Sequence, residues 1–148
     1  WYPLYYSPWR EEVYADSIRE RGPDFEIIYP ISLHITDDLD AGRMRVKQNL
    51  ALYVGGMGAR DRNFHNELIG RMGFEAQAKQ IQDLYMAGKK HEAAAAVPDE
   101  LVDEVALVGP KDRIKQQLAA WEDSAVTGLL IWPHSEQDLN DFAELILG

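Results

Sequence analysis

Two short apolar segments constrain the fold of this chain more than any other feature of its sequence. Residues 25–36 read FEIIYPISLHIT, where side chains alternate in a period of two and β-branched residues are frequent. This pattern predicts a β-strand over Glu26–Thr36. Because both faces of that strand are partly apolar, we expect it to be buried on both sides, as strands are in α/β folds. A second apolar run, Leu129–Trp132, predicts another buried strand.

Most of the remaining sequence carries helical patterns. Ser7 followed by Pro8 is typical of a helix start, and Asp37 or Asp38 caps a later helix. The stretch VALVG, at residues 105–109, fits either a helix or a strand by its pattern alone. By residue number, we expect helices over about 8–21, 38–54, 66–72, 74–86, 89–96 and 98–109, from 110 onward, and after Ser135.

The order of these elements indicates an α/β fold that is rich in helices. Strands that alternate with helices favour parallel pairing, but two strands make too small a sheet for so many helices. The chain also begins at Trp1, inside the dense aromatic stretch WYPLYYSPW. We therefore expect part of a larger fold, with Trp1–Tyr5 as a third strand beside Glu26–Thr36. The apolar faces of its first and last strands should be exposed or covered by another copy of the chain.

Composition argues against several classes of function. The 148 residues carry a net charge of −10, which does not suit a protein that binds nucleic-acid phosphates. No apolar run approaches the ~20 residues of a membrane span, so we expect a cytoplasmic protein with no membrane partner. The sequence has no cysteine and its four histidines lack metal-ligand spacing, so we expect no metal site. Standard nucleotide-binding, hydrolase and metalloprotease motifs are absent from the sequence.

Polar side chains gather near the carboxyl end of the first predicted strand. Ser32, His34 and Thr36 share one face of that strand, and His134 follows the second strand in a comparable position. In parallel α/β barrels the active site lies at the carboxyl ends of the strands. We therefore expect these residues to contact a substrate or cofactor, with His34 as the candidate catalytic proton donor. The alternatives are a buried histidine bonded to a neighbouring backbone group and, for His134, a surface loop.

The segment ALYVGGMGARDRNFHN contains a second group of candidate residues. Its helical pattern breaks at three glycines and is followed by Arg60, Arg62, Asn63 and His65. Arginine guanidinium groups suit phosphate or carboxylate ligands, so these four residues are candidates for binding a cofactor or substrate. The alternative is a solvated loop whose asparagines start the next helix, behind a glycine helix cap.

Long stretches of the sequence resemble a known family. NLALYVGGMGARDRNFHN and GFEAQAKQIQDLYMAGKKHEAAAAVPDELVDEVALVGPKDRI are similar to the C-terminal region of luciferase-like flavin or deazaflavin oxidoreductases, particularly the actinobacterial deazaflavin-dependent branch. The opening WYPLYYSP resembles the end of a late barrel strand, and GLLIWPH resembles the last strand.

The resemblance implies a TIM barrel of roughly twice this length. Residues 1–148 would then be a single unit, the last two to three βα units of the barrel without its N-terminal half. The resemblance also implies that VALVG is the end of a helix.

The implied activity is hydride transfer between a deazaflavin coenzyme, or alternatively FMN, and a small organic substrate. Arg60 and Arg62 could then meet a cofactor phosphate or an acidic substrate. We expect a homo-oligomeric enzyme, and we expect the 148-residue chain alone to be inactive. The alternative is a non-catalytic helical interaction or regulatory domain derived from such an enzyme.

Overall fold

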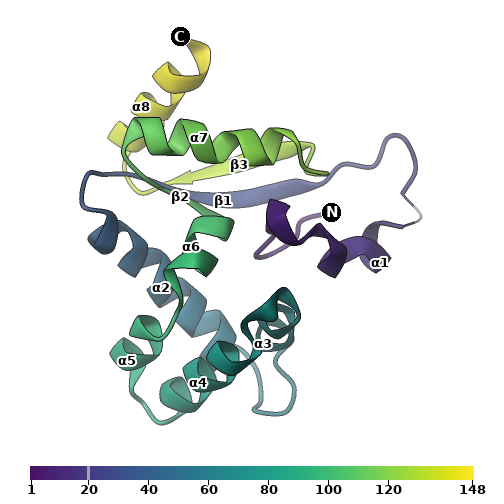
Figure 1. The fold of residues 1–148 in the computed structure, drawn as a ribbon, viewed down its shortest axis with the longest axis vertical. Helices are drawn as coiled ribbons and strands as arrows, with labels where there is room; N and C mark the ends of the chain where they lie inside the picture. The colour runs from purple at the N-terminus through teal and green to yellow at the C-terminus, as the bar shows by residue number, and fades with distance from the viewer. Residues whose placement is uncertain (20) are drawn as a thin grey trace. The chain divides into compact units, whose positions relative to one another are not determined.

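The computed structural model describes residues 1–19 and 21–148, which group into two compact units (Figure 1). The first unit combines Trp1–Gly42 with Asp103–Gly148, and the second is Arg43–Val102. The second unit is therefore an insertion into the first along the sequence. The expectation that residues 1–148 form one partial barrel stays a prediction.

A parallel three-stranded sheet is the centre of the first unit. Its strands are β1 (Ile28–Ile35), β2 (Ala106–Gly109) and β3 (Gly128–Pro133), in the order β2-β1-β3. The register places Ser32 opposite both Ala106 and Trp132. The two strands that the sequence predicts are therefore parallel neighbours, as expected, and the α/β class is confirmed.

Two expectations about the third strand are wrong. VALVG does not end a helix, because Ala106–Gly109 is the buried strand β2. Trp1–Tyr5 is not a strand, and β2 occupies the side of β1 that we assigned to it. Tyr5 has a φ of 63°, which is incompatible with extended backbone, and Pro3 has no N–H for a sheet ladder. Trp1 bonds at the start of β1, where its carbonyl accepts from the Ile28 N–H at 2.9 Å.

The predicted helix over residues 8–21 is shorter than expected. A 3₁₀-helix, η1 (Pro8–Tyr14), is followed by the single-turn helix α1 (Ala15–Ile18). The Ser7 hydroxyl accepts from the Trp9 N–H, as expected of a helix start. The predicted extension to Arg21 includes Glu20, which lies outside the described residues.

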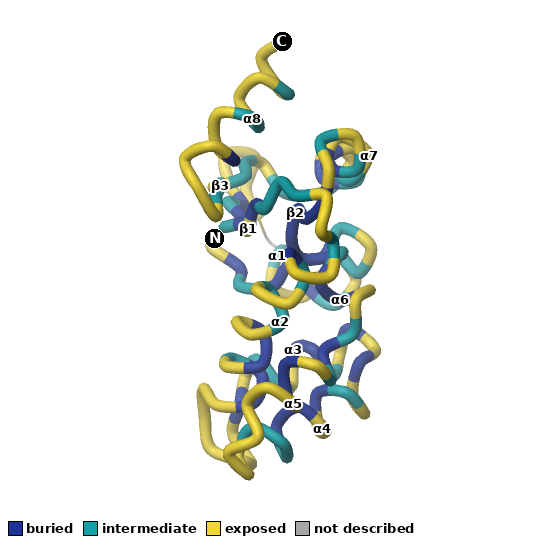
Figure 2. The backbone as a smooth tube through the Cα atoms, turned by 90° about the vertical axis from the view of Figure 1, so that its left-hand side faces the viewer, coloured by how far each residue is buried: buried dark blue, intermediate teal, exposed yellow. Residues whose placement is uncertain are grey.

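The remaining helices of the first unit follow the second and third strands. They are α7 (Lys111–Glu122) and α8 (Glu136–Leu147), and the Ser135 hydroxyl caps α8 by accepting from the Asp138 N–H. Both helices were expected from the sequence. Figure 2 shows β2 as buried and most of α8 as exposed.

An aromatic cluster packs α7 against one face of β1. The rings of Tyr29 and Trp121 are stacked, with centroids 4.9 Å apart, and Tyr6 contacts both. The Tyr29 hydroxyl donates to the Val105 carbonyl at 2.8 Å, and burial holds the pKa of Tyr29 well above its ordinary value. The aromatic N-terminal stretch is therefore partly a component of this core.

Helix α7 and the first turn of α2 (Leu39–Gly56) lie on opposite faces of β1. Trp121 of α7 stacks on Tyr29, whereas Gly42 lies against His34 and Thr36, which point the other way.

The second unit is helical. It comprises most of α2 (Leu39–Gly56), α3 (Phe64–Ile69), the π-turn η2 (Gly70–Phe74), α4 (Glu75–Met86), α5 (Lys90–Ala95) and most of α6 (Asp99–Val105). At the end of α2, a Cβ on Gly55 or Gly56 would lie 2.5 or 2.4 Å from atoms of Tyr85. These glycines therefore allow α2 and α4 to pack closely.

A buried ion pair in the first unit generates a stability prediction. Glu104 is 8% exposed, accepts two 2.7 Å bonds from Arg10, and accepts a third from the Ser7 hydroxyl at 2.8 Å. We expect Glu104→Gln to lower the free energy of unfolding of the full-length protein by about 2 kcal/mol in urea titrations, because Arg10 loses its counter-charge. Glu92→Gln, at the exposed Lys89–Glu92 pair, should change it by less than about 0.5 kcal/mol. Equal effects would contradict the importance of this ion pair.

Candidate functional site

The candidate site of the first unit lies at the carboxyl ends of β1 and β3, which we call the carboxyl edge. Ser32 is exposed, and His34 and Thr36 are partly buried, on the face of β1 that α7 does not cover. His134 directly follows β3, and its N–H donates to the Leu33 carbonyl at 2.9 Å. The fold thus gathers the predicted residues of this unit at one edge of the sheet.

The two histidines of this edge form a pair. The ring centroids of His34 and His134 are 4.5 Å apart and the rings are inclined by 54°. The two residues are far apart in the sequence, and the parallel register of β1 and β3 brings them together.

The Thr36 hydroxyl has a structural role in this edge. It accepts from the Asp38 N–H at 3.1 Å, and the Asp38 carboxylate accepts from the Ala41 N–H at 3.0 Å. These bonds hold the turn from β1 into α2 and confirm Asp38 as the predicted cap of that helix. A binding role for Thr36 stays a prediction.

Two apolar residues of β3 belong to the same face, and sequence reasoning did not assign them to the site. Leu130 is 42% exposed and Trp132 is 62% exposed, and the register sets Trp132 opposite Ser32. The exposure of these two side chains agrees with our expectation of an exposed apolar face on the last strand. The interpretation of the apolar run Leu129–Trp132 as a buried strand is wrong for these two residues.

In the second unit, Asn63 is buried and caps the start of helix α3. It is 2% exposed, and its side-chain oxygen accepts from the N–H groups of His65 and Asn66 at 3.0 Å. Its side-chain nitrogen donates to the carbonyls of Tyr53 and Val54. The alternative in which an asparagine starts the next helix is confirmed for Asn63, although Asn63 is buried rather than solvated. Asn66 lies within α3, and its side chain donates to the carbonyls of Val54 and Ala78.

The two candidate arginines have different surroundings. Arg60 forms an ion pair with Asp83 at 2.5 Å, where Lys79 also binds at 2.8 Å. Lys79 and then Arg60 hold the pKa of Asp83 below its ordinary value. Arg62 is exposed and forms no ion pair within residues 1–19 and 21–148. Of the two, Arg62 is therefore the one available to an anion.

His65 is a packed ring. It lies edge-on to Tyr53, with centroids 5.1 Å apart, and contacts Phe64. Burial lowers its pKa from the ordinary value of 6.5, which favours the neutral imidazole. We predicted that one site contains Ser32, His34 and His134 together with Arg60, Arg62, Asn63 and His65. This stays a prediction.

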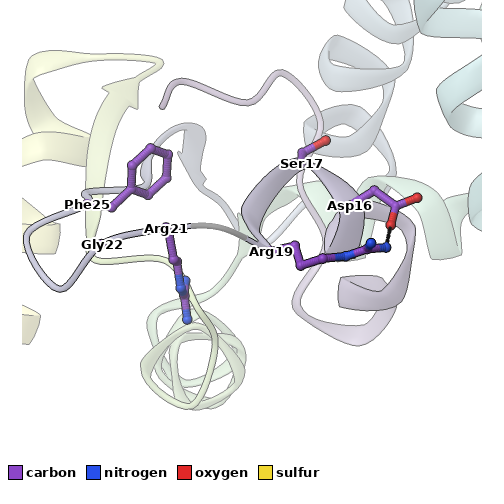
Figure 3. A pocket seen from close by; sticks show the side chains of 6 residues that line it. All are labelled: Asp16, Ser17, Arg19, Arg21, Gly22 and Phe25. Carbon is purple, nitrogen blue, oxygen red and sulfur yellow. Dashed lines mark hydrogen bonds and ion pairs between the residues drawn. The ribbon is translucent and has the colours of Figure 1, made fainter.

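A hollow elsewhere in the first unit lacks the features of a built site. It has a volume of about 510 Å³ and is lined by Asp16, Ser17, Arg19, Arg21, Gly22 and Phe25 (Figure 3). Its Arg19–Asp16 ion pair is largely exposed to solvent. Within the part of the chain that is described, no cluster of three metal-ligating side chains occurs, and no helix is long and apolar enough to cross a membrane.

Comparison with known proteins identifies the family of this chain. Residues 1–128 match the profile of the luciferase-like monooxygenase family. The chain belongs to this family. It is also 38% identical over 155 aligned positions to a Mycobacterium tuberculosis protein named as a candidate coenzyme F420-dependent oxidoreductase. That alignment covers 99% of this chain and 45% of the relative, so the chain spans about half the length of the relative.

A solved structure supports the fold of this luciferase-like chain. The coenzyme F420-dependent tetrahydromethanopterin reductase of Methanopyrus kandleri matches with a TM-score of 0.62 and 16% sequence identity. The match covers 82% of this chain and 35% of the reductase. At this identity the match shows similarity of fold only.

The contacts of Asn63 generate a prediction that separates structure from binding. Asn63→Ala removes a helix cap and two buried donors, so it should lower the free energy of unfolding of the full-length protein by about 2–3 kcal/mol. Asn63→Ser keeps a cap acceptor and should recover about 1 kcal/mol of that loss. Urea titration of both variants tests this, and an Asn63→Ala variant of unchanged stability would contradict the capping role.

Proposed function

We propose that this chain is part of a coenzyme F420-dependent oxidoreductase that transfers a hydride between the deazaflavin and a small organic substrate. The observation that carries the proposal is the grouping of Ser32, His34, His134 and Trp132 at the carboxyl edge of a parallel sheet in a member of the luciferase-like family. The name of the relative from Mycobacterium tuberculosis supports the choice of coenzyme. We further propose that the chain is the C-terminal part of a TIM barrel and that the full-length protein is a cytoplasmic homo-oligomer.

The residues of this edge fit a flat, largely apolar ring system. Such ligands need an apolar surface with a few polar groups that set their orientation. Leu130 and Trp132 offer exposed apolar surface, while Ser32 and His34 add hydroxyl and imidazole groups on the same face. No cysteine or carboxylate is needed for this arrangement.

Each residue of the edge then has a chemical role. The bound deazaflavin supplies the hydride chemistry. His34 holds the proton that the substrate gains together with the hydride, and His134 holds the orientation of the His34 ring through their ring contact. Trp132 excludes water from the reacting groups, and the Ser32 hydroxyl orients the ligand. In the second unit, Arg62 has no ion-pair partner within the described residues, and we propose it separately as a contact for an anionic ligand group.

Coenzyme choice is tested by titrating the full-length protein separately with coenzyme F420 and with FMN, following the change in ligand fluorescence. We expect saturable binding of coenzyme F420 at a concentration at which FMN does not bind. Binding of FMN in preference to coenzyme F420 would refute the coenzyme assignment. Binding of neither would favour the non-catalytic alternative.

The anion contact is tested with Arg62→Ala. Loss of a charge-assisted contact of about 1.5–3 kcal/mol should weaken coenzyme or substrate binding about tenfold to a hundredfold. The melting temperature should change little, because the Arg62 side chain is exposed. Arg71→Ala is the matched control, since Arg71 is also an exposed arginine of the second unit. A large drop in melting temperature with unaltered binding would show that Arg62 has a structural role.

A further inference from the structure

The first turn of α2 lies unusually close to the candidate proton donor. Gly42 is the fourth residue of α2, and it packs on the face of the sheet that carries His34. A Cβ added at Gly42 would lie 2.7 Å from Cγ1 of Val108 and 2.9 Å from Cγ2 of Thr36. Contacts below 3.0 Å require atoms to shift, so a side chain at position 42 would displace either the first turn of α2 or the side chains of Val108 and Thr36.

The same approach shields one nitrogen of the His34 ring. The added Cβ would lie 3.3 Å from Nδ1 of His34, and this nitrogen is buried from solvent. The ring also contacts the His134 imidazole, at a centroid distance of 4.5 Å. The His34 imidazole is thus held by a helix turn and by a second ring.

We infer that Gly42 is a positioning residue for His34: its missing side chain lets α2 close over Nδ1, so that Nε2 is the nitrogen that the ring offers to a ligand. The shielding of Nδ1 does not depend on the identity of that ligand. The consequence for catalysis rests on the proposed function, in which His34 holds the proton that the substrate gains. The imidazole acts there through Nε2 in an orientation that α2 maintains.

The experiment compares Gly42→Ala with Gly70→Ala in the full-length protein labelled with ¹⁵N-histidine. A Cβ on Gly70 would have its nearest neighbour at 3.8 Å, which is an ordinary contact, so this helical glycine is the matched control. We expect Gly42→Ala to shift the ring ¹⁵N resonances of His34 and His134, and Gly70→Ala to leave both unchanged. Resonances that Gly42→Ala does not move, or that both variants move equally, would overturn the inference.

Binding of coenzyme F420 gives a second readout. Because small displacements of catalytic groups have large effects, we expect Gly42→Ala to reduce turnover or binding by about tenfold to a hundredfold. In a His34→Asn background the same change at Gly42 should have almost no further effect, since its action passes through His34. Additive losses would show that Gly42 affects the protein only through general stability, and would overturn the inference.

The assignment of Nε2 is tested by two substitutions of His34. A glutamine amide reaches the place of Nε2, whereas an asparagine amide reaches the place of Nδ1. His34→Gln should therefore retain more ligand binding than His34→Asn, and the reverse order would overturn the assignment. If neither variant affects binding or turnover, the proposed function of His34 fails, while the ¹⁵N comparison still decides whether Gly42 positions the ring.

A relief variant covers the case in which Gly42→Ala does not fold. Gly42→Ala combined with Val108→Ala removes Cγ1 of Val108, which is the atom closest to the new methyl group. We expect this double variant to fold and still to shift the His34 ring ¹⁵N resonances, because the new methyl group lies 2.9 Å from Cγ2 of Thr36 and 3.3 Å from Nδ1 of His34. Val108→Ala alone should leave those resonances near their native positions. Resonances of the double variant that equal those of Val108→Ala alone would overturn the inference, whether or not Gly42→Ala folds.

Discussion

The pairing of β1 with parallel neighbours on both sides is the constraint on which the first unit depends. A central parallel strand needs partners for the backbone groups along both of its edges, and β2 and β3 supply them. One face of β1 is then sealed by Tyr29, Ile31 and Leu33, which are at most 2% exposed. The other face is left for Ser32 and His34. The carboxyl edge therefore depends on the pairing of β1 with β2 and β3, which provides hydrogen-bond partners for the backbone of β1.

The same register explains why the site is assembled from distant parts of the sequence. Leu33 lies opposite Pro133, and the next residue, His134, donates its N–H back to the Leu33 carbonyl. Two histidine rings meet as a result, with a tryptophan and a serine on the same face. This combination of polar groups and exposed apolar surface is the basis of the proposed aromatic organic ligand. Helix α2 adds to it by covering one side of His34.

Residues of one chemical type have different roles in this molecule, and the contacts of each side chain determine its role. Asn63 has all of its side-chain polar groups engaged by backbone, so it is a cap within the second unit. Arg60 is neutralised by Asp83, whereas Arg62 extends from the same loop without an ion-pair partner among the described residues. Arg10 stabilises the first unit through the buried Glu104. A basic or amide residue in a loop is therefore a candidate ligand only when the fold does not use it.

Several features of this protein were determined by the sequence alone. Hydrophobic periodicity predicted a strand over Glu26–Thr36, where the structure has Ile28–Ile35, and an apolar run predicted one over Leu129–Trp132, where it has Gly128–Pro133. Periodicity also predicted most of the helices, because the period of a segment reports on its own burial. It also placed Ser32, His34 and His134 at strand ends. Only the tertiary structure decided which segment forms the third strand. VALVG is too short for its period to separate a strand from a helix, and it contains β2. Trp1–Tyr5 is not a strand, because Tyr5 adopts a positive φ where its carbonyl accepts from the Tyr14 hydroxyl. It likewise decided that Trp132 is exposed beside Ser32 and that Gly42 covers His34, because periodicity within one segment does not specify which segment will pack against it.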